Sequence, residues 1–368
     1  MVSSAKAYRM TSIPDPSPPS RPHALTRSLL GLSIGVAGGA LFDWLETPIP
    51  WLLGPLFAVA CVNLAGVRVG CPAGSRQAGQ VILGTVIGLY FTAEITGIVF
   101  AYLPWMILVA IVAIALGGFG ALVHTRFAGL DGPTAFFGSV PGGMAEMITL
   151  GDRYHAEPVA LVLSQTIRVT IVVVTIPAAL TYWGIAGDEV FRPAVSEVDW
   201  ALVPALLGGA AAVALALNRA GVTNAWMLGA CGFVAVLTAF EIRWTAMPPV
   251  FLITAQVLIG ASLGERFERE ALARAPRVIV GAALTTVVMM AVGAGLAALV
   301  AASTGVSLSA MIAAAAPGGL AEMSITAQVL GLGVPLVTAY HIVRVLMITL
   351  FTLPLFRLAR RLAAGRAG

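Results

Sequence analysis

Residues 141–147 read PGGMAEM and residues 317–323 read PGGLAEM, so six of seven positions are identical at an offset of 176 in the numbering. Each copy lies inside an apolar stretch of the chain. Proline has no backbone N–H and glycine permits unwound backbone, so neither copy continues a helix smoothly. The sequence therefore predicts two broken helices at corresponding places in a duplicated chain.

Other blocks repeat at the same offset and in the same order. Gln80 and Gln256 are each followed by glycines four and eight positions later, and Arg168 corresponds to Arg344. The tetrapeptide WLLG at 51–54 matches WMLG at 226–229, at an offset of 175. Four blocks in one order predict an internal duplication of most of the chain.

The composition predicts a membrane protein. Hydrophobic residues make up 59% of the 368 positions, Asp, Glu, Lys and Arg only 10%, and the mean hydropathy is +0.94. A soluble domain carries about 25% charged residues, so the sequence excludes a soluble enzyme, a secreted disulfide scaffold and a disordered chain. Twelve apolar runs follow one another, at 28–45, 48–66, 78–91, 97–123, 132–150, 156–183, 199–218, 223–240, 245–264, 276–302, 307–330 and 334–356.

The charges between these runs predict how the chain crosses the bilayer. If each broken element enters and leaves on one side, each half has about five spans and the basic loops fall on the cytoplasmic side with both termini. Asp43, Glu46, Glu94 and an acidic linker then fall outside, and only Arg192 and Arg243 lie on the side that the rule disfavours. An odd number of spans inverts the second repeat, so the two broken elements enter from opposite faces and meet near the midplane.

The predicted fold is thus an all-α polytopic protein of the bacterial inner membrane, with two inverted repeats. The predicted segments are a disordered cytoplasmic tail (1–26), membrane repeat 1 (27–187), an acidic linker (188–198), membrane repeat 2 (199–360) and a basic tail (361–368).

The broken elements and the charges beside them are the candidate binding site. Free backbone amides at a break attract anions, and freed carbonyl groups attract cations. The alternative is a packing kink that binds no ligand. An intramembrane carboxylate is costly, so each Glu is predicted to carry a proton, bind Na⁺ or pair with a nearby Arg. Each Arg needs a Glu or an anionic substrate as partner, unless it snorkels to an interface. Gln80 and Gln256 lie on glycine-rich helices, and packing is the favoured role for them. Gln165 and His341 are weaker candidates next to the arginines. The main candidates are Pro141, Gly142, Gly143, Glu146, Arg168, Pro317, Gly318, Gly319, Glu322 and Arg344.

The duplicated motif, the Trp-x-Leu-Gly turns and the Arg-bearing helices resemble the AbrB-type membrane protein family over roughly residues 30–360. Members of that family are named ammonia monooxygenase or regulator of gene expression. Neither name follows from these residues. A copper oxygenase needs clustered histidines, and the chain has four scattered ones. Direct DNA binding needs a basic soluble domain, which the tail at 1–26 does not supply.

The sequence favours a secondary transporter or exchanger of a small polar or anionic solute. The alternative is a membrane-embedded sensor that affects gene expression indirectly, and a monooxygenase-like enzyme ranks last. We expect no enzyme activity, no metal, no cofactor and no direct nucleic-acid partner. The expected partners are the lipid bilayer and an unidentified small molecule or ion, and the oligomeric state is left open, a homo-oligomer included.

Overall fold

The structure is a computed structural model that describes residues 21–184, 191, 193–194, 197–242 and 244–365. The described residues form sixteen α-helices and one π-helix, and none of them forms a strand. Of the predicted segments, most of the N-terminal tail and much of the acidic linker lie outside the described residues, as do residues 366–368. Residues 21–26 of the expected tail already belong to α1.

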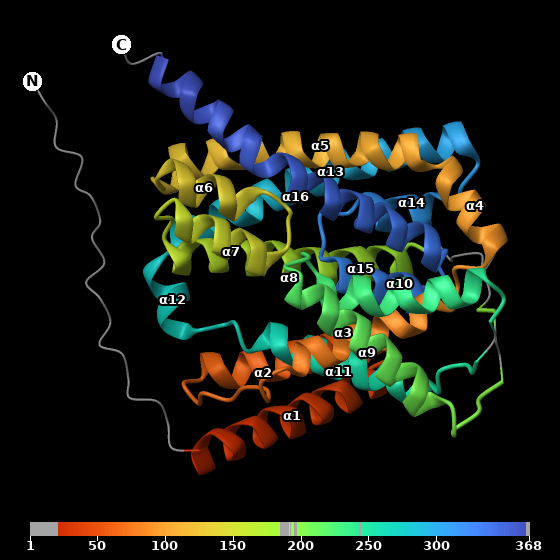
Figure 1. The fold of residues 1–368 in the computed structure, drawn as a ribbon. Coiled ribbons are helices and arrows are strands. Elements are labelled where there is room, and N and C mark those ends of the chain that lie inside the picture. Colours follow the sequence, from red (N-terminus) through yellow and green to blue (C-terminus); the bar gives the residue numbers. More distant parts are fainter. Residues whose placement is uncertain (1–20, 185–190, 192, 195–196, 243, 366–368) are drawn as a thin grey trace, which may run out of the picture.

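The helices follow the apolar runs closely (Figure 1). Their bounds are α1 (Arg21–Trp44), α2 (Pro50–Leu64), α3 (Ser75–Gly88), α4 (Ala93–Ala101), α5 (Leu103–Val123), the π-helix η1 (His124–Ala128), α6 (Gly132–Ser139), α7 (Met144–Arg153), α8 (Pro158–Tyr182), α9 (Val203–Arg219), α10 (Ala225–Ala239), α11 (Pro249–Gly264), α12 (Arg269–Arg274), α13 (Pro276–Thr304), α14 (Leu308–Ala315), α15 (Leu320–Leu330) and α16 (Val334–Gly365).

Three of the runs are broken. The PGG motifs separate α6 from α7 and α14 from α15, as the sequence predicts. The apolar run at 97–123 is also divided, because the chain turns at Tyr102 between α4 and α5. Pro104 follows at the start of α5, and it lacks the backbone N–H that would continue a helix from α4. The proline therefore marks a boundary inside an otherwise uniform apolar run.

Four helical segments are long and apolar enough to cross a bilayer: Leu103–Ala128, Pro158–Tyr182, Pro276–Thr304 and Val334–Arg361. A fifth results if α3 and α4, bent by 98° at their junction, count as one span. Five further apolar helices, α2, α9, α10, α11 and α15, have 10–17 residues and are shorter than one bilayer crossing. These helices establish a helical protein with several membrane-spanning segments.

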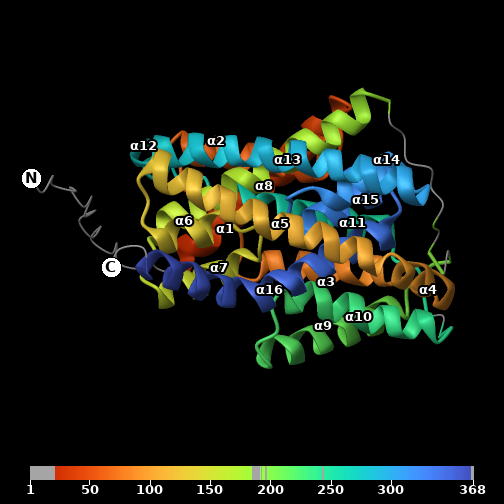
Figure 2. The same cartoon turned by 90° about the horizontal axis from the view of Figure 1, so that it is seen from above.

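The helices form two layers (Figures 1 and 2). In the panel layer, α1, α2, α11, α3, α10 and α9 contact one another in that spatial order. In the hairpin layer, α5, α8, α13 and α16 surround the two broken pairs, α6–α7 and α14–α15. Helices α4 and α12 connect the layers at opposite ends of the molecule (Figure 1). In the panel layer, α11 of the second half lies between α2 and α3 of the first half, and α3 lies between α11 and α10 of the second half.

Glycines allow the closest helix contacts in the panel layer. A Cβ atom on Gly84 of α3 would lie 2.7 Å from the carbonyl oxygen of Met227 on α10. On α11, a Cβ atom at Gly260 would overlap the carbonyl oxygen of Leu52 on α2. The glycines that the sequence assigns to packing therefore bring each half's helix against a helix of the other half.

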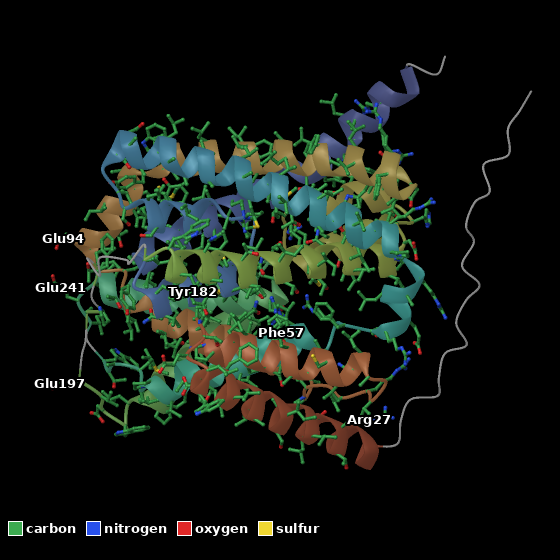
Figure 3. All side chains as sticks on the ribbon, turned by 180° about the vertical axis from the view of Figure 1, so that it is seen from behind. Arg27, Phe57, Glu94, Tyr182, Glu197 and Glu241 are labelled. Carbon is green, nitrogen blue, oxygen red and sulfur yellow. The ribbon has the colours of Figure 1, made fainter. Side chains whose placement is uncertain are left out.

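Charged side chains differ between the two ends of the molecule. Figure 3 shows Glu94, Glu197 and Glu241 at one end and Arg27 at the other. Near the Arg27 end, Arg68 forms an exposed ion pair of 2.9 Å with Glu270 of α12. Along the direction of the helix axes, the labelled acidic side chains thus lie at one end of the molecule and the labelled basic side chain at the other.

Candidate functional site

Both broken elements line one cavity between the layers. Its volume is about 50 Å³, enough for a few water molecules. Pro141, Gly142 and Gly143 line it from the first motif, and Gly318 and Gly319 line it from the second. Two segments far apart in the sequence, each predicted to be a break, therefore meet at one place.

The proline of the second motif lies on the other side of the breaks. Pro317 and Pro141 both line a smaller cavity of about 20 Å³, with apolar residues of α5 and α13. The cavity lined by the glycines is the polar one, because arginines and a glutamate also reach it.

Arg168 of α8 and Arg344 of α16 hold the carbonyl groups freed at the breaks. The side chains of Arg168 and Arg344 are 4% and 2% exposed. Arg168 Nη1 donates to the carbonyl oxygen of Val140 at 3.2 Å, and Arg344 Nη1 donates to that of Ala316 at 2.5 Å. Arg344 Nη2 also donates to the carbonyl oxygen of Gly318. Among the described contacts neither arginine forms an ion pair with a glutamate, so the Glu–Arg pair that the sequence offers as one alternative is not seen at the breaks.

Gln165 and His341 supply a second pair of contacts to the same segments. Gln165 Nε2 donates to the carbonyl oxygen of Phe137 at 2.8 Å. His341 Nε2 lies 3.0 Å from the carbonyl oxygen of Ala313 and is in place to donate to it. Both residues therefore support the broken helices, and Gln165 also lines the cavity.

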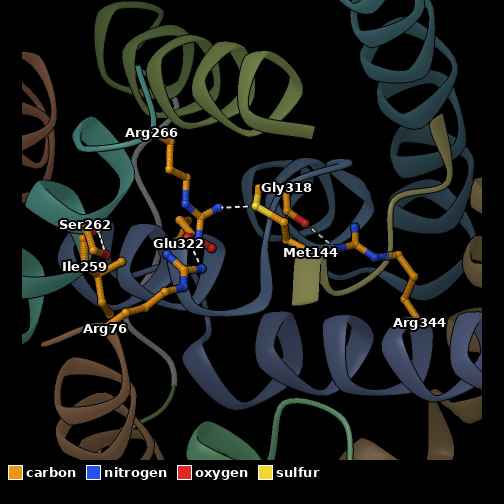
Figure 4. A network of polar contacts seen from close by, with 8 residues as sticks. All are labelled: Arg76, Met144, Ile259, Ser262, Arg266, Gly318, Glu322 and Arg344. Atoms are coloured by element: carbon orange, nitrogen blue, oxygen red, sulfur yellow. Dashed lines mark hydrogen bonds and ion pairs between the residues drawn. The ribbon is translucent and has the colours of Figure 1, made fainter. Parts of the chain in front are cut away.

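Glu322 of α15 carries the one carboxylate among the described residues that line the cavity. It is 1% exposed, and its Oε1 accepts a hydrogen bond of 2.8 Å from Arg76 Nη2 (Figure 4). Arg266 approaches the same carboxylate and contacts the sulfur of Met144. A Cβ atom on Gly319 would overlap Glu322 Oε2, so the glycine provides the space that the carboxylate occupies.

The corresponding glutamate of the first motif lies elsewhere. Glu146 of α7 is partly buried, does not line the cavity, and accepts a hydrogen bond of 3.0 Å from Thr349 Oγ1 on α16. Gln80 lines the cavity, whereas Gln256, although 4% exposed, does not. The two copies of the motif thus place equivalent residues in unequal surroundings.

Sequence reasoning missed two of the arginines in the site. Arg76, at the start of α3, and Arg266, just after α11, were expected to lie in cytoplasmic loops, but both line the cavity. At the offset of 176 between the two motifs, the corresponding positions are Leu252 and Tyr90, so a search for repeated charges does not find these arginines. Long-range packing of α3 against α11 is what brings them together.

The cavity is electropositive. Four arginines line it and one glutamate opposes them. Helices α7, α15 and α10 begin beside it, at Gly143, Gly319 and Asn224, and a helix N-terminus attracts negative charge. Five buried polar atoms of the lining residues have no hydrogen-bond partner among the described residues. Three are donors, Nε of Arg168, Nε of Arg344 and Nη1 of Arg76, and two are acceptors, Oε2 of Glu322 and Oε1 of Gln165. The arrangement is suited to bind an anion.

Beside the site, the α2–α3 loop meets the segment that follows α11. Cys71 donates its backbone N–H to Glu265 Oε2 at 3.2 Å. Burial, and then the nearby Glu265 carboxylate, raise the pKa of the Cys71 thiol to about 12. Burial also raises the pKa of Glu265. This junction and the Arg68–Glu270 pair line a surface cleft of about 270 Å³ at the end of the molecule that carries Arg27.

Comparison with known proteins gives the family. A family model described as "Transition state regulatory protein AbrB" matches residues 51–360. A protein of Escherichia coli K12 named "Putative regulator AbrB" is 25% identical over 269 residues, which cover 71% of this chain and 74% of that protein. "Uncharacterized protein YhjN" of Bacillus subtilis 168 is 26% identical over 295 residues, which cover 73% and 76%. No solved structure matches the chain. Because the family model spans most of the sequence, this helical membrane protein belongs to the AbrB family.

Proposed function

We propose that the protein is a secondary transporter or exchanger of a small anionic solute in the bacterial inner membrane. The observation that carries the proposal is the cavity in which two broken helices and four arginines meet. Buried positive charge without compensating anions is unfavourable, so a bound anion would stabilise this arrangement. The volume of about 50 Å³ favours a solute of a few non-hydrogen atoms.

Matched contacts support an inverted repeat as the framework. The hydrogen bonds from Arg168 to Val140 and from Arg344 to Ala316 join positions that correspond at an offset of 176. The neighbours of the motif glycines correspond too. A Cβ atom on Gly142 would lie 3.0 Å from Ile348 of α16, and one on Gly318 would lie 3.1 Å from Val172 of α8. In the panel layer the contact of α3 with α10 corresponds to that of α11 with α2.

In this proposal the two layers move relative to each other during transport. The cavity lies between them, with Arg76 on the panel layer and Glu322 on the hairpin layer. A shift of one layer would expose the cavity to one face of the membrane and then to the other, as in other transporters with inverted repeats. The charge separation along the helices supports an orientation with the Arg27 end in the cytoplasm.

Uptake into proteoliposomes tests the proposal. We expect radiolabelled acetate or succinate to enter vesicles that contain the protein, and Arg168→Lys to reduce the rate at least tenfold, because lysine lacks the planar fork of donors. Arg126→Gln, which alters an exposed arginine outside the cavity, is the matched control and should transport at the wild-type rate. Equal rates for Arg168→Lys and the wild type would contradict the proposal.

A sensor is the second candidate, because the Escherichia coli relative is named a regulator. The same cavity would then bind an anion without moving it across the membrane. Anion binding to purified protein, together with no uptake above that of empty vesicles, would favour the sensor. We continue to expect that the protein is not an enzyme.

A further inference from the structure

We infer that Glu322 is a tethered anion that occupies part of the anion site, and that an incoming small carboxylate replaces it at Arg76 and moves together with one proton taken up by Glu322. This inference rests on the proposed function and adds the coupling ion to it.

The geometry gives Glu322 the position of a ligand. Its carboxylate is bound by Arg76 through Oε1, and Oε2 is buried with no partner among the described residues. Arg76 Nη1 also has no partner among the described residues, so Arg76 binds the carboxylate through only one of its two Nη groups. A carboxylate ligand satisfies two N–H groups of a guanidinium at once, and the tethered carboxylate meets one of them. An anion that is free to orient itself can therefore bind Arg76 better than Glu322 does.

Space makes the exchange competitive. The cavity has room for roughly four water-sized molecules, which is about the size of acetate. Gly319 has no side chain, and Glu322 Oε2 occupies the position that a Cβ atom of this residue would take. A second carboxylate can enter this space beside Glu322, but it takes both Nη groups of Arg76 only when the Glu322 carboxylate moves away.

Among the described residues that line the cavity, every charged group other than Glu322 is an arginine. Arg76 comes from α3, Arg266 from the segment after α11, Arg168 from α8 and Arg344 from α16. Glu265, which does not line the cavity, also interacts with Arg266. When a bound anion takes over these arginines, the buried Glu322 carboxylate loses its compensation and is neutralised by forming an O–H bond. The proton comes from water on the side of entry and leaves when the Arg76 pair forms again, so one negative charge and one positive charge move together.

Proton uptake on binding tests the inference. Purified protein in detergent, weakly buffered near pH 7 with a pH indicator, is titrated with sodium acetate, and binding is followed in parallel by thermal stabilisation. We expect the wild type to take up about one proton per acetate bound. Glu322→Gln should bind acetate at least tenfold more tightly, because the competing carboxylate is gone, and should take up no proton.

Two further variants make the test specific. Glu146→Gln alters the corresponding glutamate, which lies outside the cavity, and should take up protons as the wild type does. Arg76→Gln removes both the ionic partner of Glu322 and the group that receives the incoming carboxylate, so acetate binding should weaken at least tenfold. Glu322→Ala replaces Glu322→Gln if the latter does not fold, and it should likewise take up no proton.

The outcomes separate the two proposals. Wild-type protein that binds acetate without proton uptake, or Glu322→Gln protein that still takes up a proton, overturns the inference and leaves the anion transporter standing. A Glu322→Gln variant that loses acetate binding also overturns it, because Glu322 would then assist binding. If neither acetate nor succinate stabilises the wild type, the proposed function fails and the inference fails with it.

Discussion

Gly319→Ala tests the environment of Glu322 with a single methyl group. Gly319 precedes α15 with φ −77° and ψ 154°, which alanine adopts without strain. The added Cβ atom would overlap Glu322 Oε2. The carboxylate must therefore shift, and we expect this shift to break the 2.8 Å ion pair of Oε1 with Arg76.

The expected cost follows from the exposure of the two partners. Breaking a buried ion pair typically destabilises a protein by about 3–5 kcal/mol, because a charge is left buried without compensation. The Arg76 side chain is 26% exposed, so water compensates part of its charge, whereas Glu322 is 1% exposed. We therefore expect the free energy of unfolding to fall by about 2–3 kcal/mol, below the range for a fully buried pair.

A double-mutant cycle isolates this effect. The free energy of unfolding is measured by reversible denaturation in mixed micelles for the wild type, Gly319→Ala, Glu322→Ala and the double variant. In the Glu322→Ala background the added methyl meets no carboxylate, so Gly319→Ala should change the free energy by less than about 0.5 kcal/mol. If Gly319→Ala costs the same in both backgrounds, the carboxylate does not occupy the space beside Gly319 and the reasoning is refuted.

Two further predictions concern helix packing and cysteine reactivity. Gly84→Ala should lower the free energy of unfolding by about 1–3 kcal/mol, because its Cβ atom would lie 2.7 Å from a carbonyl oxygen of α10. Gly232→Ala is the control: open space surrounds this glycine, so the substitution should be neutral or stabilising in the same denaturation assay. With its pKa near 12, the Cys71 thiol should react slowly with a water-soluble methanethiosulfonate at pH 8, since the thiolate is the nucleophile. Glu265→Gln removes a nearby negative charge, so it should lower that pKa and speed the reaction, and an unchanged or slower rate would contradict the assigned cause.

Much of the fold follows from local features of the sequence. Long apolar runs and their proline and glycine interruptions set the helix ends, because a helix in a membrane must satisfy its own backbone hydrogen bonds. The apolar run at 97–123 is divided for a related reason. Pro104 sits only a few residues into that run, and hydropathy is high on both sides of it, so composition alone does not reveal the turn at Tyr102.

The site was predictable only where it is repeated. Arg168, Arg344 and the glycines of the two motifs stand out as matched pairs, and the structure places them around one cavity. The duplicated acids suggest equal roles, but Arg76 has a counterpart in Leu252, so only Glu322 receives an arginine. Such asymmetry arises from contacts between distant segments, and a repeat search reports what two halves share and omits what distinguishes them.

The exchange of helix partners in the panel layer has a consequence for biosynthesis. Helix α3 packs against α10, but the ribosome starts to synthesise α10 about 140 residues after it has completed α3. At 5–20 residues per second this delay is roughly 7–30 s. During this interval the glycine-bearing face of α3, which includes Gly84, lacks its partner. The first half of the chain should therefore remain open to proteolysis, or depend on a membrane-embedded chaperone, until translation of the second half closes the layer.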